Sequence, residues 1–323
     1  MQLGINMCFA VNRLIEPAAW AEFVRGDLDL DTVQFSFDLL DPWWPDIHRS
    51  ALIRRIRAAV ETHALVIDSA CAGRAHSVPA GLLDSDPAAR SVARRWWRRA
   101  CDLAAELGAS AVGGPLGTLS PRVAVDPAAR GDRCRELVDS LEAITDYAAA
   151  AGLRELLIEP IPQTREYPST ISQCLELFDG LRNRCAIPVG FTLDIGQALF
   201  EPSFGPQAKA ETWISALGAG ILMLRVNNSS RLGDPGWGWT HERGQGRAPI
   251  AGCVEAVGLN DVPVTLEVCP QFGENDEEAR RVLVASVNHC RRYLGIAPPK
   301  GHERPYPVGR RLAAIFWGLP GGT

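Results

Sequence analysis

The chain has 323 residues, a formal net charge of −5, 46% hydrophobic residues and 22% charged residues. This composition is ordinary for a globular enzyme with a sizeable core. The acidic balance gives no reason to expect a nucleic-acid partner, which would normally need a basic face. No apolar run reaches the roughly 18 residues of a membrane span, and the N-terminus shows no signal-peptide pattern, so we expect a cytoplasmic protein.

Short apolar runs typical of buried strands alternate with stretches at helical spacing. The expected strands are 3–10, 32–37, 64–70, 110–114, 156–159, 189–194, 221–226 and 262–267. The expected helices are 17–25, 45–63, 87–107, 130–151, 168–181, 207–217 and 275–293, with one more after the seventh strand. This order predicts an α/β chain that folds as a single (β/α)8 TIM-type barrel rather than an open doubly wound sheet.

We expect the barrel domain to span residues 1–297. The tail, residues 298–323, is rich in Pro, Gly and Arg and is interpreted as a C-terminal extension that packs on the barrel or on a neighbouring subunit. The loop after the second strand contains Trp43 and Trp44, which would either wall a ligand pocket or form a plug or subunit contact. The loop and the tail together favour a homodimer.

The nine cysteines of the chain are scattered without a C-x-x-C pair. This spacing predicts neither a zinc ribbon nor a disulfide framework. We therefore expect them to behave as small buried hydrophobic residues in a reducing compartment.

Three of the expected strands end in a carboxylate: Glu159, Asp194 and Glu267. One such acid would commonly cap the following loop or helix, but the carboxyl ends of barrel strands converge on the face where active sites are built. We therefore predict that the three acids lie together. The same strand ends carry further polar candidates for ligand binding: Asn6, Cys8, Asp38, Asp68 or Ser69, Arg225, Asn227 and Asn228.

Hard oxygen donors from several strands suit Mg²⁺ or Mn²⁺, so we expect a divalent metal at Glu159, Asp194 and Glu267. Without a cation, three carboxylates in one barrel mouth would repel one another and raise the pKa of at least one of them. A bound ion, a close arginine or a shared proton should therefore be present.

In this order the residues resemble the xylose isomerase-like barrels, which include sugar isomerases, ketose 3-epimerases and apurinic endonucleases. The resemblance covers roughly residues 3–294 in strand order. Members typically place a glutamate after strand five, an aspartate after strand six, a histidine on strand seven and a glutamate after strand eight. Glu159, Asp194 and Glu267 match three of these positions. The stretch His241-Glu242-Arg243-Gly244-Gln245-Gly246 is similar to the family's His-x-x-Pro/Gly-x-Gly turn and makes His241 a candidate for substrate binding.

The chain departs from the family pattern at two positions. Arg225 stands where the strand-seven histidine is expected, and Gln197 replaces histidine in the family's Asp-x-Gly-His-like stretch. Arginine cannot ligate a metal, because it stays protonated and offers no lone pair. Either the three carboxylates hold the metal with an amide oxygen or water and Arg225 contacts substrate, or Arg225 itself balances their charge. Arg225 and Gln197 are candidates for substrate binding, and a purely structural ion pair of Arg225 with Glu159 or Asp194 is the alternative.

The resemblance implies proton transfer next to a carbonyl through an enediolate, with Glu159 and Glu267 as the acid/base pair on opposite sides of a small carbohydrate. We therefore expect a sugar or sugar-phosphate isomerase or epimerase. Arg231 and Arg243 follow Arg225 and would bind a phosphate unless they are simply solvated. A related enolising enzyme, such as a hydroxypyruvate-type isomerase or an inosose dehydratase, stays open. A binding or scaffold barrel that has lost its metal is another open alternative. An apurinic-site endonuclease is a further one, but it would need a histidine-rich zinc site, and the chain has only six histidines.

Overall fold

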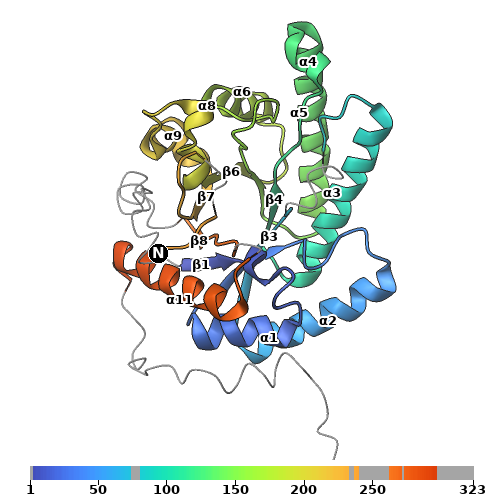
Figure 1. The fold of residues 1–323 in the computed structure, drawn as a ribbon. Coiled ribbons are helices and arrows are strands. Elements are labelled where there is room, and N and C mark those ends of the chain that lie inside the picture. Colours follow the sequence, from blue (N-terminus) through green and yellow to red (C-terminus); the bar gives the residue numbers. More distant parts are fainter. Residues whose placement is uncertain (1–2, 74–80, 233–235, 240–261, 271–272, 297–323) are drawn as a thin grey trace, which may run out of the picture.

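The computed structural model describes residues 3–73, 81–232, 236–239, 262–270 and 273–296, and its strands form a closed parallel barrel in sequence order (Figure 1). Each strand pairs with the next one, and the last pairs with the first. The strands are β1 Leu3–Asn6, β2 Thr32–Ser36, β3 Val66–Cys71, β4 Ala111–Gly114, β5 Glu155–Ile158, β6 Val189–Asp194, β7 Ile221–Val226 and β8 Val264–Leu266. The predicted eight-stranded barrel is confirmed.

Helices surround the strands on the outside of the barrel (Figure 1). They are α1 Pro17–Glu22, α2 Asp46–Thr62, α3 Pro87–Leu107, α4 Pro121–Val125, α5 Pro127–Ala150, α6 Ile171–Leu181, α7 Ile195–Ala198, α8 Glu201–Phe204, α9 Ala210–Leu217 and α11 Asp276–Tyr293. Several begin at a residue whose side chain accepts a hydrogen bond from the first turn, as at Asp86, Asp126, Thr170 and Asn275. Such caps satisfy amide groups that have no partner inside the helix.

Local capping decides where several elements begin or end. The first strand ends at Asn6, whose side chain accepts from the Cys8 amide and starts the 3-10 helix η1, Met7–Ala10. The helix that Pro168-Ser169-Thr170 was expected to introduce begins at Ile171, with the Thr170 hydroxyl as its cap. The short helices α4, α7 and α8 were too brief to give a periodic signal. The expected C-terminal extension lies outside the described residues and stays a prediction.

A polar layer interrupts the apolar interior of the barrel. In the strand register Asn6 of β1 pairs with Gln34 of β2, and Gln34 pairs with Ser69 of β3. On the other side of β1, which pairs with β8, Arg225 of β7 pairs with Thr265 of β8. All of these residues are buried. In a barrel, side chains from alternate strands fill the interior in layers, so this register places their polar groups at one level.

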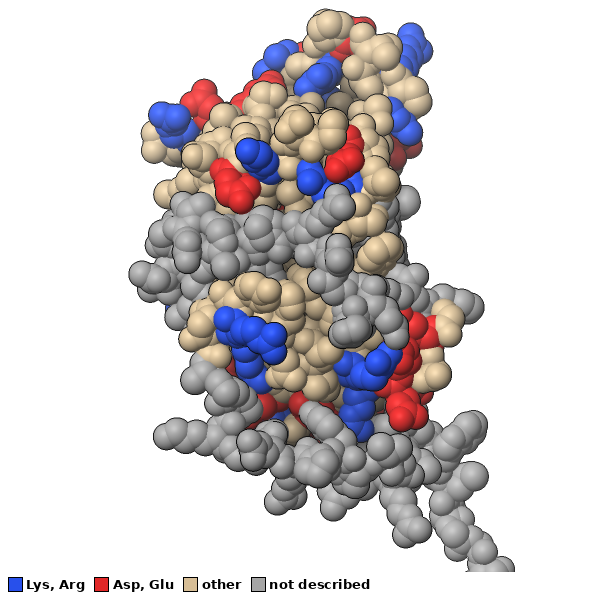
Figure 2. Space-filling view, turned by 60° about the vertical axis from the view of Figure 1, so that its left-hand side comes forward, with Lys and Arg blue, Asp and Glu red and all other residues tan. Residues whose placement is uncertain are grey.

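The surface of the described residues carries charged side chains of both signs and two exposed tryptophans. On the face shown in Figure 2, Lys and Arg side chains of the described residues are mixed with Asp and Glu. No helix among the described residues is both long and apolar enough to cross a membrane. Trp43 and Trp44 are exposed, and Arg99 of α3 donates to the Pro42 carbonyl oxygen beside them. The expected homodimer stays a prediction.

Candidate active site

The centre of the barrel mouth is the guanidinium of Arg225, at the end of β7. Its Nη1 donates a hydrogen bond of 2.6 Å to Glu159 Oε1 and lies 3.6 Å from Glu267 Oε2. Arg225 and Glu159 are 3% and 6% exposed, so the pair is held away from bulk water. Electrostatic interactions are stronger in such buried surroundings than in water. Although burial alone would lower it, the two carboxylates raise the pKa of Arg225 above its ordinary value. A permanent cation therefore lies between two of the three predicted acids.

Gln34 of β2 fixes the other end of the guanidinium. Its Oε1 accepts from Arg225 Nη2 at 3.0 Å and from Asn6 Nδ2 at 2.7 Å. Its Nε2 donates to Ser69 Oγ at 3.1 Å. The Arg225 side chain is thus anchored from β2 and β5 at once, and such a fixed donor array is preorganised for a ligand.

Asp194, at the end of β6, forms the third side of the site. Its Oδ1 accepts from the Gln197 amide at 2.9 Å, and its Oδ2 accepts from Asn227 Nδ2 at 2.8 Å. Burial and then repulsion from the Glu267 carboxylate raise the pKa of Asp194 well above its ordinary range. Gln197 also donates from Nε2 to Glu159 Oε1 at 2.9 Å, so it joins the two acids.

Three buried polar atoms around these acids have no hydrogen-bond partner in the described part of the chain. They are the acceptors Gln197 Oε1 and Asn227 Oδ1 and the donor Arg225 Nε. Buried polar groups in native proteins are nearly always paired with protein, water or ligand, and an unpaired one costs about 1–3 kcal/mol. Two acceptors and one donor beside a carboxylate pair suit a ligand that carries several hydroxyl groups.

The three predicted metal ligands do not form a ligand cluster as they stand. Both oxygens of Asp194 and one of Glu159 accept hydrogen bonds from the protein, and the Arg225 cation lies between Glu159 and Glu267. Among the described residues, the group of three or more potential ligands whose ligand atoms all lie within 4.8 Å of one another is Cys8, Glu267 and Cys269. A divalent ion held by Glu159, Asp194 and Glu267 would have to displace Arg225, whose charge repels it.

The other predicted binding residues are placed differently. Asn228 uses its side chain within the protein, since its Nδ2 donates to the Gly238 carbonyl oxygen and its Oδ1 accepts from the Ser229 amide. Asp38 follows β2, and its carboxylate packs against Gly73. It fills the space that a Cβ atom on residue 73 would occupy. Asn6 supports Gln34, as described above. His241, Arg243 and the glycine-containing turn lie outside the described residues.

Arg231 is the described member of the expected phosphate-binding arginines. Its Nη2 donates to the carbonyl oxygens of Pro206 and Ala208, and its Nε lies 3.1 Å from a Glu201 carboxylate oxygen. These contacts tie the loop after β7 to α8 and to the segment before α9. They favour a structural role for Arg231.

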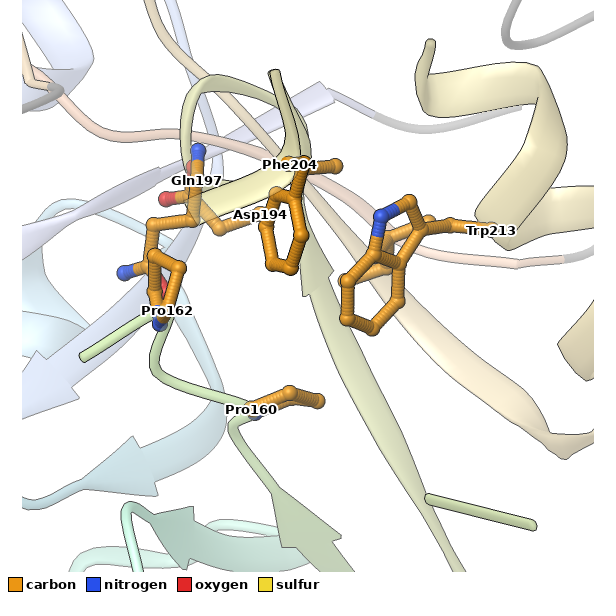
Figure 3. A pocket seen from close by; sticks show the side chains of 8 residues that line it. Pro160, Pro162, Asp194, Gln197, Phe204 and Trp213 are labelled. Carbon is orange, nitrogen blue, oxygen red and sulfur yellow. The ribbon is translucent and has the colours of Figure 1, made fainter. Parts of the chain in front are cut away.

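A small cavity lies beside Asp194 and Gln197, between the loop after β5 and the helices α7 to α9 (Figure 3). Its walls are largely apolar and include Phe204 and Trp213, whose rings meet edge to face at 5.3 Å. Its volume is about 10 Å³, which is room for about one water molecule and far below the several hundred Å³ of ordinary ligand pockets. It is a packing space behind the site and does not hold a sugar.

Gln34 was not among the site residues predicted from the sequence. A signal was available, because a buried strand of a parallel barrel is usually apolar throughout, and Gln34 breaks the run Thr32–Ser36. Nothing local, however, connects Gln34 with Arg225, which lies 191 positions later in the chain. Only closure of the barrel brings the two together.

Comparison with known proteins places the fold in a family. A family model described as a xylose isomerase-like TIM barrel matches residues 26–288. D-Erythrulose 1-phosphate 3-epimerase of Brucella abortus (strain 2308) is 28% identical over 200 residues, which cover 60% of this chain and 63% of that protein. The match thus spans less than two thirds of that relative's length.

Solved structures agree with this assignment. A crystal structure of a candidate xylose isomerase from Rhodospirillum rubrum ATCC 11170 has a TM-score of 0.85 and 31% identity, covering 92% of this chain and 100% of that one. The D-psicose 3-epimerase of Clostridium cellulolyticum H10, solved with D-tagatose, has a TM-score of 0.67 at 16% identity and covers 91% and 99% of the two chains, which is a likeness of fold. The chain belongs to the xylose isomerase-like TIM-barrel family.

Proposed function

We propose that the protein is a sugar or sugar-phosphate isomerase or epimerase that uses Glu159 and Glu267 as its acid/base pair. One observation carries the proposal: two carboxylates from the ends of β5 and β8 meet a single buried guanidinium at the barrel mouth, at 2.6 and 3.6 Å. Carboxylates poised on either side of a fixed cation suit the removal of a proton next to a carbonyl.

The chemistry follows from this arrangement. One carboxylate takes the proton from the carbon beside the carbonyl, and the electron pair of the broken C–H bond moves to the carbonyl oxygen to give an enediolate. The Arg225 N–H groups stabilise that oxygen as its negative charge develops. Return of a proton to the same carbon from the other carboxylate inverts the centre, whereas return to the neighbouring carbon gives isomerisation. Neither outcome needs a redox cofactor.

Proteins of this family commonly bind a divalent metal. The sequence-based prediction of Mg²⁺ or Mn²⁺ at Glu159, Asp194 and Glu267 stays a prediction. The contacts of Arg225 support the other interpretation, in which the guanidinium balances the carboxylates.

For the substrate we propose a small ketose or its phosphate. The unpaired Gln197 Oε1, Asn227 Oδ1 and Arg225 Nε fit the hydroxyl and carbonyl groups of such a molecule. The Brucella relative acts, by its name, on D-erythrulose 1-phosphate, and the Clostridium neighbour is a D-psicose 3-epimerase. For this chain we propose only the substrate class, ketoses and ketose phosphates, and neither of these two sugars in particular.

Solvent-deuterium exchange tests the proposal. The protein is incubated in D₂O with a panel of ketoses and ketose 1-phosphates, and loss of substrate C–H signals is followed by NMR. We expect Glu159→Gln and Glu267→Gln each to reduce exchange by at least about 10³-fold, as expected for loss of an essential acid/base group. Glu155→Gln is the matched control, because Glu155 starts the same strand that Glu159 follows, at the opposite end of the barrel.

Two outcomes would contradict the assignment. Full exchange in both Glu159→Gln and Glu267→Gln would remove these residues as the acid/base pair. Binding of sugars with no exchange or turnover in the wild-type protein would instead support the alternative of a binding barrel that has lost catalysis.

A further inference from the structure

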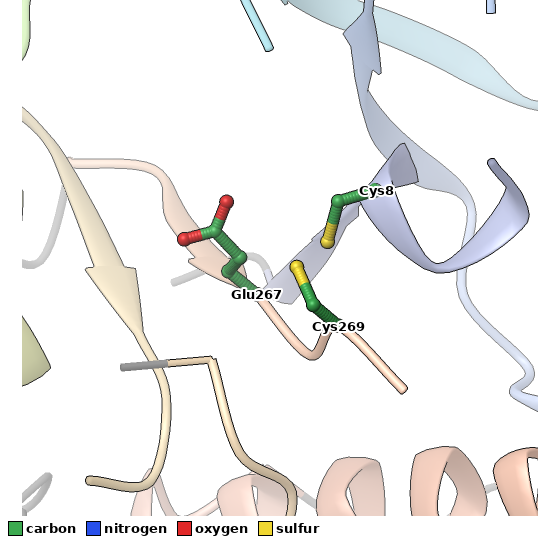
Figure 4. A group of neighbouring side chains, drawn as sticks. All are labelled: Cys8, Glu267 and Cys269. Atoms are coloured by element: carbon green, nitrogen blue, oxygen red, sulfur yellow. The ribbon is translucent and has the colours of Figure 1, made fainter. Parts of the chain in front are cut away.

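A second group of potential ligands lies at the junction between the first and last strands of the barrel. Atoms of Cys8, Glu267 and Cys269 that can ligate a metal all lie within 4.8 Å of one another. Cys8 belongs to η1 after β1, and the other two follow β8 (Figure 4). Figure 4 shows the two thiols turned toward each other, with the Glu267 carboxylate on the adjoining side. Both cysteines are free thiols.

Backbone contacts hold the three residues in this arrangement. The Glu267 amide donates to the Val226 carbonyl oxygen at 2.8 Å, and the Cys269 amide donates to Gly236 at 2.8 Å. The amides of residues 267 and 269 thus both donate to the segment formed by β7 and the loop after it. Every second amide in a strand faces the same neighbour, so the side chains of residues 267 and 269 lie on the same face. Val268, between them, is buried on the other side, and its carbonyl oxygen accepts from the Cys8 thiol at 3.4 Å. The group is therefore built into the barrel closure and not formed by mobile surface side chains.

Two sulfurs and one carboxylate oxygen indicate a particular class of ion. Thiolate ligands select zinc and similar soft or borderline metals over Mg²⁺ and Mn²⁺. Zinc–ligand distances of about 2.0–2.3 Å place the ligand atoms of a tetrahedral site roughly 3.3–3.8 Å apart, which a small contraction of this group would reach. A third ligand beside the thiol pair favours a metal over a disulfide, which would need only the two sulfurs. Three protein ligands also leave the fourth position open.

We infer that Cys8, Glu267 and Cys269 form a binding site for a thiophilic divalent ion of the zinc class, distinct from the expected Glu159/Asp194/Glu267 site. Because Glu267 belongs to both groups, an ion bound here withdraws Glu267 from its partnership with Glu159 and inhibits proton transfer. This second statement rests on the proposed function. The first does not.

Titration with Cd²⁺ tests the site without any need for turnover. Reduced, chelator-treated wild-type protein is titrated while the ultraviolet charge-transfer absorption of the cadmium–thiolate bond is recorded, and Zn²⁺ is then used as a competitor. We expect one equivalent of Cd²⁺ to bind and Zn²⁺ to displace it. Cys8→Ser and Cys269→Ser should each weaken binding by about 100-fold or more, and Glu267→Gln by about 10-fold with the absorption band retained.

Cys185→Ser is the matched control, since Cys185 is also a partly buried free thiol but precedes β6 at the far end of the barrel. It should bind Cd²⁺ as the wild type does. No thiolate band in the wild type, or an equal band in Cys8→Ser, would overturn the site.

Inhibition is measured by deuterium exchange with and without one equivalent of Zn²⁺, and each variant is compared with itself. The wild type should lose most of its exchange on adding Zn²⁺, whereas Cys8→Ser should change little. Stoichiometric binding with unaltered exchange would overturn the inhibitory role alone. If no sugar is exchanged at all, the proposed function fails, and the Cd²⁺ titration still decides the site.

Discussion

The Arg225 guanidinium and the Glu159 carboxylate form a buried ion pair with a 2.6 Å contact, at the family position where a histidine is expected in place of the arginine. The same nitrogen lies 3.6 Å from Glu267. The cation at the barrel mouth is therefore a side chain of the protein and is present whether or not a metal ion binds.

Removing the guanidinium should destabilise the fold. Arg225→Gln leaves the Glu159 carboxylate buried without its partner, and breaking a buried pair in this way costs about 3–5 kcal/mol in the free energy of unfolding. Urea unfolding at neutral pH measures the loss. The double variant Arg225→Gln/Glu159→Gln removes the uncompensated charge as well and should recover part of the stability. Wild-type stability in Arg225→Gln would show that Arg225 does not balance these acids.

Arg225→Lys keeps the charge but loses the fork that contacts Glu159 and Gln34 together. We expect kcat/KM to fall by about 10²–10³-fold, as on removal of a donor that stabilises a developing oxyanion, with most of the effect in kcat. Steady-state kinetics on the best substrate from the exchange screen measure this. A loss confined to KM would instead make Arg225 a residue for ground-state binding.

Arg225→His restores the residue type that the family places on strand seven. The change removes the cation between Glu159 and Glu267 and adds an imidazole ligand beside three carboxylates, a set that suits Mn²⁺. We expect the variant to bind one Mn²⁺ by calorimetry and the wild type to bind it at least about 10²-fold more weakly, as expected when a fixed positive charge occupies the centre of the site. Tight Mn²⁺ binding by the wild type, with activity lost on chelation, would support the metal at Glu159, Asp194 and Glu267 instead.

Gln34 should act as a positioning residue for Arg225. Gln34→Met is similar in volume but removes the oxygen that accepts from Arg225 and Asn6, which leaves buried donors unpaired and costs about 1–3 kcal/mol. We expect kcat to fall by about 10-fold with little change in KM. Gln34→Glu keeps an acceptor oxygen at this place and should retain more activity than Gln34→Met. Equal kcat values in the two variants would separate Gln34 from the chemistry.

Protonation of Asp68 and Glu155, which lie away from the barrel mouth, should contribute to the pH dependence of the free energy of unfolding. Burial raises the pKa of Asp68 and of Glu155, and Arg154 offsets this only in part. Because the folded pKa values lie above the unfolded ones of about 4, the folded state binds more protons in that window, and stability falls as pH rises through it. Asp68→Asn should flatten this slope, which is at most about 1.4 kcal/mol per pH unit for one proton. An unchanged slope in urea unfolding from about pH 4 to pH 7 would contradict this.

The sequence by itself determined the strand order and the acids at three strand ends. Runs such as Val189–Asp194 and Ile221–Val226 are apolar, short and bounded by turn residues, so their local pattern was enough to place β6 and β7. The alternation of eight strands with eight helical segments then favoured a closed parallel barrel over an open doubly wound sheet. Strand order alone therefore assigns Glu159, Asp194 and Glu267 to one face of the barrel, because all three follow the carboxyl ends of parallel strands.

Only the tertiary structure decided how the charge of those acids is met. The Arg225 side chain could turn toward substrate, toward a carboxylate or away, and local sequence does not choose among these directions. The choice depends on Gln34, which is brought to Arg225 by barrel closure and fixes the guanidinium against Glu159. The same holds for Cys8, a strand-end candidate, and Cys269, which no sequence pattern placed beside it until β1 and β8 paired. Hydrogen bonds and ion pairs between residues far apart in the chain form only when the barrel closes and brings distant strands together.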